Sequence, residues 1–598
     1  MKGLLSMNNI YARNMKYLKN INLSLYNKIL NLEVKNVEII KAKDSSNTLV
    51  KKVDDGYISI HSRYNTKEQS KFICEYALKD DPDIIFIMGM GLGYETKDIV
   101  AKSNGKRCFI IEPDSEIFKV AMQNINIKNV FNNNNNIYFI QDDRHEKIAQ
   151  FFNSLVENDK KLKIKLVALP AYEILYSDLI EKLMKSIKEL LNIYRVNINT
   201  YTSSHRAWFQ SHIINLKYLK ETSPISKLHS KFNNIPAIIV GAGPSLNYNL
   251  DHLKKVGDKA IIVPVGTGVN VLEKNKIRGH ILGGIDVWSD EEILFSNLVE
   301  NKNSALFYSS MVCHSVPSFF KRNKFLMNTV YMDYFIHQGL GWKCYNMFSG
   351  ASVANVMAYN LAQLGCNPII LLGQDFCYSN GKNYAEGAQN YEDMTEKFKQ
   401  DGYLKVKNVK GDDVYTIPSF VSMKQSIEFC IKLNPQVKFL NGNSIGLNID
   451  GAYNIDFNEY VDNELSNSQT YNIDEIINNC YKEHIKEVDN ELIDQFVENV
   501  IVDIRNSIQI LKEVIKTIES SESRRYKLKY LNDVKKKLDG IGLYKYVIKD
   551  SVENVEYVYA NQDEIEKSLN LYSYALDKLL IMENAYKYEI LEVEVNEY

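Results

Sequence analysis

Short, mostly apolar runs alternate with amphipathic stretches along the first three quarters of the chain. Runs of this kind occupy residues 84–88, 108–111, 137–141, 164–169, 238–240, 261–265, 280–282, 305–308 and 369–372. Because these runs are mostly apolar rather than alternating, with Gln141, Lys165 and His280 as the polar exceptions, they are typical of parallel strands that are buried on both faces. The stretches between them have the spacing of helices. The pattern therefore predicts an α/β protein with two tandem Rossmann-like domains.

The pattern changes beyond residue 470, where glycine and proline almost disappear. Apolar residues there recur at helical spacing, at Val497, Val500, Ile501, Ile504, Ile508 and Leu511. This spacing predicts a C-terminal helical bundle. We expect four parts: a mixed N-terminal segment (1–65), a Rossmann-like N-terminal domain (66–200), a central Rossmann-like domain (201–460) and a helical domain (461–598).

Composition excludes several classes of protein. Among 598 residues, 72 are basic and 74 acidic. The net charge of -2 therefore gives no overall positive charge of the kind that binds nucleic acid or an anionic membrane surface. No apolar stretch approaches the roughly 18 residues of a membrane span. The eight cysteines are scattered without metal-ligand spacing. We therefore expect a cytoplasmic protein with reduced cysteines, no metal site, no nucleic-acid partner and no membrane span.

The first glycine turn follows the run at 84–88. It contains Gly89, Gly91 and Gly93, and Glu112 ends the next apolar run. A glycine turn with an acidic residue about 20 positions later is the pattern of nucleotide-binding Rossmann domains, in which Glu112 would hold a ribose. The alternative is a Rossmann-like scaffold without a ligand, because no catalytic group is apparent beyond this fingerprint.

A second glycine loop follows the run at 238–240. Its residues are Gly241, Ala242, Gly243, Pro244 and Ser245. Bare backbone lets a phosphate or ribose approach the N–H groups at the start of the next helix. A plain connection between a strand and a helix has the same appearance, so segments farther along the chain must decide.

Asp286 is the first of these downstream features. It follows Gly283 and Gly284 at the carboxyl end of a strand, the edge at which open α/β sheets bind ligands. Its carboxylate could accept a hydrogen bond from a base, ribose or sugar hydroxyl, or ligate a divalent ion. The alternative is a helix N-cap before the acidic residues 290–292.

Small hydroxylated residues open a later helix. Ser349, Gly350 and Ser352 precede its apolar positions. Because the first-turn N–H groups of a helix are unpaired, these residues predict a site for an anion or a hydroxyl group. A simple N-cap by Ser349 is the alternative.

The run at 369–372 ends in a segment rich in polar and aromatic groups. Gln374 and Asp375 follow it, and Tyr378 and Tyr384 come after them. Two phenols near one loop can donate hydrogen bonds to a leaving phosphate as it gains charge, which requires no metal. The chain holds 39 tyrosines, so the spacing of these two carries the prediction.

Together these segments resemble a known family. The loop 241–246, the pair Ser349-Gly350, the segment 373–376 and the turn 378–385 have the order and approximate spacing of the motility-associated factor (Maf) flagellin glycosyltransferases. The central domain is similar, more distantly, to bacterial sialyltransferases that use a CMP-activated sugar. The resemblance implies a sialyltransferase-like fold that binds CMP at the glycine loop and at Ser349-Gly350.

The resemblance also implies a reaction. A nonulosonic acid of the pseudaminic or legionaminic type would pass from CMP to serine or threonine hydroxyls of flagellin, a step needed for the bacterial flagellum and motility. Tyr378 and Tyr384 would hold the leaving phosphate, and Asp286 would make a changed polar contact with the donor. No cofactor is required by this reading, although Mg²⁺ is not excluded.

The general base has no counterpart in this chain. Sialyltransferases of this kind use a histidine downstream of the tyrosines, yet no histidine lies between His337 and His484. The residues whose chemistry could replace it are Asp375, Glu386, Asp412, Asp413 and His314.

Two other functions compete with sugar transfer. The domain also resembles archaeal pterin diphosphokinases, in which the carboxylates of Asp286 and Asp375 would hold Mg²⁺ and ATP. A third possibility is a non-catalytic flagellin-binding accessory protein, in which the Rossmann-like units are scaffolds and the C-terminal helices dock the partner.

Overall fold

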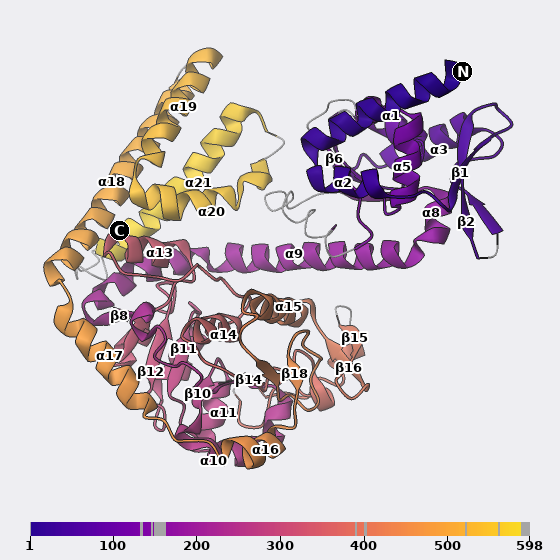
Figure 1. The fold of residues 1–598 in the computed structure, drawn as a ribbon. Helices are drawn as coiled ribbons and strands as arrows, with labels where there is room; N and C mark the ends of the chain where they lie inside the picture. The colour runs from indigo at the N-terminus through magenta and orange to yellow at the C-terminus, as the bar shows by residue number, and fades with distance from the viewer. Residues whose placement is uncertain are drawn as a thin grey trace. The chain divides into compact units, whose positions relative to one another are not determined.

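The computed structural model describes residues 2–54, 56–103, 105–131, 136–144, 148, 163–388, 391–399, 403–520, 523–559 and 562–587 (Figure 1). The chain divides into two compact units, Met1–Arg195 and Val196–Tyr598.

A parallel sheet forms the centre of the first unit. Its strands run in the order β6-β5-β4-β7, and every neighbouring pair is parallel. Their bounds are β4 (Ile84–Met88), β5 (Arg107–Ile111), β6 (Ile137–Ile140) and β7 (Ile164–Ala168). All five residues of β4 are buried, as its unbroken apolar sequence predicts.

The helices of the first unit connect and cover these strands. They are α3 (Thr66–Leu78), α4 (Tyr94–Lys102), α5 (Ser115–Asn124), α6 (Ile127–Phe131), α8 (Pro170–Leu175) and α9 (Ser177–Ile214). The side chain of Asp114 caps α5 by accepting hydrogen bonds from the N–H groups of Glu116 and Ile117. The long helix α9 leads into the second unit.

The first 65 residues form two helices and a small antiparallel sheet. The helices are α1 (Lys2–Ile21) and α2 (Leu23–Asn31), and the strands are β1 (Val37–Lys41), β2 (Asn47–Val53) and β3 (Gly56–Ser59). Asn22 separates the helices because its side chain caps α2 through the N–H of Leu25. The chain after β3 passes the glycine turn at 89–93.

The second unit contains two parallel sheets where the sequence predicts one. Their orders are β10-β9-β14-β17-β18 and β11-β12-β13-β8. A single parallel bridge between Val265 and Gly283 joins β10 to β11. The ladder stops after this one pair because the chain turns after Val265 into α11, which begins at Gly268. The prediction of one continuous sheet is therefore corrected, whereas that of parallel strands is confirmed.

These strands are short and mostly buried. They are β8 (Thr222–Pro224), β9 (Ala237–Val240), β10 (Ile261–Pro264), β11 (Ile281–Gly284), β12 (Ala305–Tyr308), β13 (Lys324–Leu326), β14 (Ile369–Leu372), β17 (Phe439–Asn441) and β18 (Tyr453–Asn454). An antiparallel hairpin, β15 (Leu404–Lys407) with β16 (Asp413–Thr416), stands apart from both sheets.

Helices between the strands cover these sheets. They are α10 (Leu250–Val256), α11 (Gly268–Lys274), α12 (Ser289–Ser296), α13 (Tyr331–Gly339), α14 (Val353–Gln363), α15 (Pro418–Leu433) and α16 (Phe457–Tyr460). The positions from Val353 to Ala362 are all buried, so α14 is a core helix of this unit.

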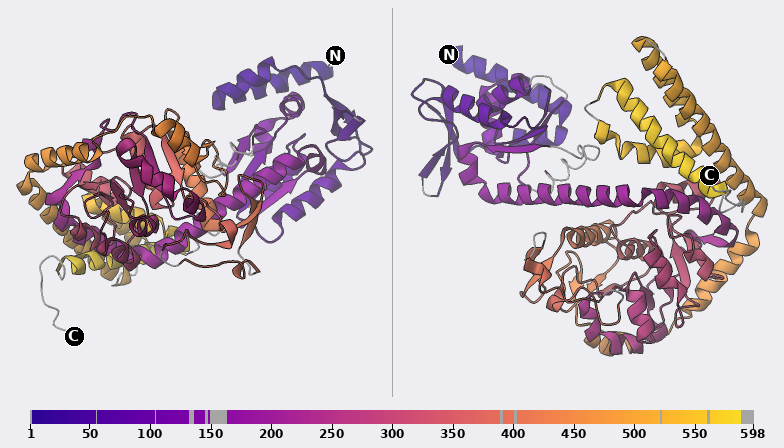
Figure 2. Two further views of the ribbon diagram at one scale, coloured as in Figure 1. Left: turned by 90° about the horizontal axis from the view of Figure 1, so that it is seen from below. Right: turned by 180° about the vertical axis from the view of Figure 1, so that it is seen from behind.

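The last part of the chain is helical, as its apolar spacing predicts. It consists mainly of α17 (Ile473–Glu487), α18 (Asn490–Ser520), α19 (Arg524–Asp539), α20 (Lys549–Glu553) and α21 (Glu564–Ala585) (Figure 2). Apolar residues of α18 share one core cluster with Leu306 and Leu326 of the sheet. These helices therefore belong to the same compact unit as the two parallel sheets.

Within the part of the chain that the structure describes, no helix is both long enough and apolar enough to cross a membrane.

Candidate functional site

The glycine loop 241–243 packs against the loop that follows β14. A Cβ atom on Gly241 would lie 2.2 Å from Nε2 of Gln374, and one on Gly243 would lie 2.7 Å from Cγ of Asp375. Both distances are far shorter than normal contacts, so any side chain at these positions would push the two loops apart. Glycine is therefore required here by the approach of one loop to another.

Asp375 fixes this contact. Its Oδ2 accepts a hydrogen bond from the backbone N–H of Ser245 at 2.8 Å, and its Oδ1 accepts one from the Ser245 hydroxyl. Asp375 is 2% exposed and Ser245 is fully buried. Burial raises the pKa of Asp375 to about 6, while the hydrogen bonds from Ser245 oppose the rise. The carboxylate is thus a clamp between the two loops.

A cavity of about 430 Å³ opens beside the clamp. Its wall combines the glycine loop, the turn after β11, the start of α14 and the segment after β14. The predicted site residues on this wall are Gly241, Ala242, Gly243, Asp286, Ser352, Gln374, Asp375 and Tyr384. The fold therefore brings together members of all four segments singled out in the central domain.

Other predicted residues lie off the wall. Pro244 and Ser245 are in the 3₁₀ turn behind the glycine loop, and Ser349 and Gly350 precede the helix start. Ser349 is exposed, and the N-cap of α14 is Ser352, whose hydroxyl accepts from the N–H of Asn355. The alternative of an N-cap at Ser349 is therefore wrong, because the helix begins three residues later than that reading assumes.

The two predicted tyrosines have different surroundings. Tyr384 lines the cavity. The ring of Tyr378 packs against Phe398, Tyr403 and Phe420, with centroid distances of 5.5, 5.6 and 5.3 Å. Burial raises the pKa of Tyr378 to about 12, with smaller contributions from Tyr403 and Tyr384. Because Phe420 is itself on the cavity wall, Tyr378 lies one layer behind it.

Most candidates for the missing base do not line the cavity. Of the described residues, those that line it do not include Glu386, Asp412, Asp413 or His314. Asp413 also forms ion pairs with Lys405 and Lys407, which lower its pKa to about 2. Asp375 does reach the wall, but Ser245 binds both of its oxygen atoms.

Asp286 faces the cavity with its carboxylate exposed. The N-cap position of α12 is occupied by Trp288, so the alternative of an N-cap role for Asp286 is wrong. The surrounding cavity wall partly shields this carboxyl from water, and the desolvation raises its pKa. The residue remains available for a ligand.

Glu291 is a wall residue that the sequence did not reveal. In the sequence it is one of three consecutive acidic residues, 290–292, at the start of a helix, a pattern that usually reflects only the helix dipole. In the fold it is 7% exposed and lines the cavity. Burial and the nearby charge of Asp286 raise its pKa well above the ordinary value.

The wall is acidic. It carries Asp286, Asp290, Glu291 and Asp375, and none of its described residues is a lysine, arginine or histidine. The start of α14 supplies the opposite polarity, because first-turn N–H groups and the helix dipole favour an anion there. Among the described residues, no group of three or more His, Cys, Asp or Glu side chains is placed to hold a metal ion.

In the first unit, buried side chains of the same chain accept hydrogen bonds from the N–H groups of the glycine turn. Glu112 is fully buried, and its carboxylate accepts hydrogen bonds from the N–H groups of Met90 (3.0 Å), Gly91 (3.3 Å) and Asp114 (3.0 Å). The hydroxyl of Tyr172 donates a further hydrogen bond at 2.6 Å. Burial raises the pKa of Glu112 to about 7, and these hydrogen bonds oppose the rise.

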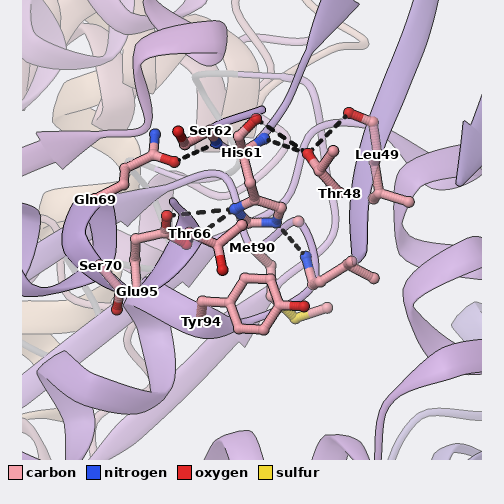
Figure 3. Close-up of polar contacts among 12 residues, drawn as sticks. Thr48, Leu49, His61, Ser62, Thr66, Gln69, Ser70, Met90, Tyr94 and Glu95 are labelled. Atoms are coloured by element: carbon pink, nitrogen blue, oxygen red, sulfur yellow. Dashed lines mark hydrogen bonds and ion pairs between the residues drawn. The ribbon is translucent and has the colours of Figure 1, made fainter. Parts of the chain in front are cut away.

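His61 approaches the same turn (Figure 3). Its Nε2 accepts a hydrogen bond from the N–H of Leu92 at 2.7 Å, and its Nδ1 lies 3.1 Å from the Glu95 carboxylate, with both side chains fully buried. A Cβ on Gly91 would lie 2.4 Å from the imidazole. The N–H groups a phosphate would use are thus taken by side chains, which favours the scaffold alternative for Gly89, Gly91, Gly93 and Glu112.

Comparisons with known proteins find one family match in each unit. Residues 49–196 match the family described as the glycosyltransferase Maf N-terminal domain. Residues 210–381 match the family described as 6-hydroxymethylpterin diphosphokinase MptE-like. The second match contains most of the cavity wall. No curated protein matches the sequence.

A solved structure shares the whole fold. It is the Maf glycosyltransferase from Magnetospirillum magneticum AMB-1, and the alignment covers 99% of this chain and 98% of that one with a TM-score of 0.59. The sequences are 12% identical, so the likeness concerns the fold. It extends over both units and the C-terminal helices.

Proposed function

We propose that this chain is a glycosyltransferase of the Maf type and that it transfers a nonulosonic acid from its CMP-activated form to serine or threonine hydroxyls of flagellin. The observation that supports this proposal is the cavity in which the glycine loop, the start of α14 and Tyr384 meet. The choice of CMP, of a pseudaminic or legionaminic sugar and of flagellin rests on the motif resemblance. The acceptor and the donor sugar are therefore the parts that experiment must test first.

The wall suits departure of a phosphate. As the bond between sugar and phosphate breaks, the anomeric carbon gains oxocarbenium character and the phosphate gains charge. The phenol of Tyr384 and the N–H groups at the start of α14 would stabilise that charge as hydrogen-bond donors that the fold already holds on the cavity wall. Direct displacement by the acceptor would invert the anomeric centre.

The decisive experiment incubates the full-length protein with CMP-pseudaminic or CMP-legionaminic acid and purified monomeric flagellin. We expect the intact mass of flagellin to rise by one or more sugar units, and CMP to raise the melting temperature of the enzyme more than ADP, NAD or S-adenosylmethionine. An unchanged mass with every donor would overturn the proposal. Flagellin binding without a mass change would instead indicate an accessory protein.

Tyr384→Phe is expected to lower kcat by about 100-fold with little change in the binding of CMP, because removal of one preorganised donor to a developing anion costs this much. The measurement is steady-state release of CMP in the presence of acceptor. Tyr415→Phe is the matched control. The ring of Tyr415 stacks on Phe398 with a centroid distance of 4.5 Å, and Tyr415 does not line the cavity. Equal loss in both variants would contradict the role of Tyr384.

A second candidate function is a Mg²⁺-dependent diphosphokinase, as the MptE-like match allows. The acidic wall favours it, because an anionic nucleotide there needs a balancing cation. Mg²⁺ is usually held by one or two carboxylates together with substrate phosphates. Of the two carboxylates predicted for this role, Asp286 has free oxygen atoms on the wall, whereas both oxygen atoms of Asp375 are bound by Ser245. ATP-dependent diphosphate transfer to a pterin, abolished by EDTA, would favour this function over sugar transfer.

A further inference from the structure

Two carboxyl groups on the cavity wall have unused oxygen atoms. Asp286 receives no side-chain hydrogen bond or ion pair from any residue that the structure describes, and its carboxylate is exposed to the cavity. Oε2 of Glu291 is buried and has no hydrogen-bond partner among the described residues. A buried oxygen without a partner is costly unless a ligand or a proton satisfies it.

Glu291 holds the turn that carries Asp286. Its Oε1 accepts a hydrogen bond from the N–H of Ile285 at 3.2 Å, directly before Asp286 in the chain. On the other side, the N–H of Cys313 donates to the backbone oxygen of Asp286 at 2.8 Å. The backbone of Asp286 is thus anchored from both sides while its side chain stays free.

Titratable groups surround the pair. Asp286 and Cys313 act on Glu291 electrostatically. On α12 itself, Asp290 and Glu292 flank Glu291. The short helix η5 (Val316–Phe319) packs against α12, and His314 lies in the segment that leads to it. Asp375 and Tyr384 lie elsewhere on the cavity wall. The nearby charge of Asp286 disfavours ionisation of Glu291.

We propose that Asp286 is the general base of the sugar transfer and that Glu291 is the residue that positions it. The inference rests on the proposed function. The proton of the acceptor hydroxyl moves to an oxygen of Asp286 while the acceptor oxygen bonds to the anomeric carbon. The bond from that carbon to the phosphate oxygen breaks, and its electron pair leaves with CMP. Asp286 then releases the proton to water.

The protonation of the pair agrees with this division of roles. Burial and the nearby charge of Asp286 raise the pKa of Glu291 well above its ordinary value, so ionisation of Glu291 is disfavoured while Asp286 is ionised. A base works best when its pKa lies near the working pH, and burial raises the pKa of Asp286 in that direction. Glu291 therefore acts on Asp286 through the turn, by its hydrogen bond with the N–H of Ile285, and removal of that bond should loosen the position of the base.

The test compares Asp286→Asn, Glu291→Gln, Glu291→Ala and the exposed control Glu292→Gln in the flagellin transfer assay across pH. Asp286→Asn should lower kcat by about 10³-fold, within the range typical of a lost general base, while CMP still raises the melting temperature as in wild type. Glu291→Gln keeps an acceptor for the N–H of Ile285 and should retain the kcat and the pH profile of wild type. Glu291→Ala, which removes that acceptor, should lower kcat by about tenfold with little change in KM. Glu292→Gln should match wild type.

Rescue and stability give independent measurements. Added formate should raise the kcat of Asp286→Ala by about tenfold or more, because a small carboxylate can replace the lost base. The melting temperature of Glu291→Gln should exceed that of wild type by an amount that grows above pH 4.5. The reason is that a raised carboxyl pKa makes ionisation costly to the folded state as pH rises, and glutamine cannot ionise.

Each failure has a distinct meaning. A wild-type enzyme that transfers no sugar overturns the proposed function, and the assignment of a base falls with it. An active wild type with Asp286→Asn within tenfold of it overturns Asp286 as the base. A kcat of Glu291→Ala equal to that of Glu291→Gln overturns the role of Glu291 as the positioning residue.

Discussion

Asp375→Ala is expected to abolish measurable CMP binding and to lower the free energy of unfolding by about 4 kcal/mol. The substitution leaves the N–H and hydroxyl of Ser245 buried without an acceptor, and each such loss costs about 1 to 3 kcal/mol. It also removes the contact that holds the glycine loop against the loop after β14. Chemical denaturation and calorimetric titration with CMP measure the two effects.

The matched variant is Ser245→Ala, alone and combined with Asp375→Ala. If the two residues act as one clamp, the double variant should cost about 1 to 3 kcal/mol less than the sum of the single ones. The pH dependence is a second check. Because the folded pKa of Asp375 is raised to about 6, wild-type stability should fall between about pH 4 and 6, and the alanine variant should lack that slope. Additive energies would contradict the clamp.

Glu112→Ala is expected to destabilise the first unit by about 4 kcal/mol without changing CMP binding. The substitution leaves the N–H groups of Met90, Gly91 and Asp114 and the hydroxyl of Tyr172 without their acceptor inside the core. Hydrogen exchange at Met90 and Gly91 measures the effect locally, and thermal melting measures it for the unit.

Tyr172→Phe provides the comparison, because it removes one donor and leaves the carboxylate with three. Its cost should be about 1 kcal/mol. The pKa of Glu112 is raised to about 7, so its stabilisation is fullest near pH 4 and declines as pH rises to 7. If a nucleotide raised the melting temperature of wild type but not of Glu112→Ala, the turn would be a ligand site rather than a scaffold.

The local pattern of the chain predicted most of the secondary structure of the core. The run at 84–88 becomes β4 and the run at 369–372 becomes β14, as is typical of short unbroken apolar segments that end in glycine turns. The spacing from Val497 to Leu511 becomes part of α18. The extent of pairing between β10 and β11 was not predictable, since it depends on where the chain leaves the sheet.

The site was predicted in part for a similar reason. Glycine loops and strand-end residues can be found from sequence, because a strand end always lies at the edge of its sheet. Glu291 was missed because it differs from Asp290 and Glu292 only in the direction its side chain takes after folding. Nothing in the local sequence of an acidic helix start distinguishes the buried member.

The sequence by itself determined the α/β class, the helical C-terminal region and the segments that supply the cavity wall, because these depend on apolar periodicity and on glycine. Only the tertiary structure decided which polar groups face the cavity: Tyr384 rather than Tyr378, Ser352 rather than Ser349, and Glu291 as well as Asp286. The physical reason is that burial and hydrogen bonding between distant segments, such as the clamp of Asp375 on Ser245, arise only when the strands assemble.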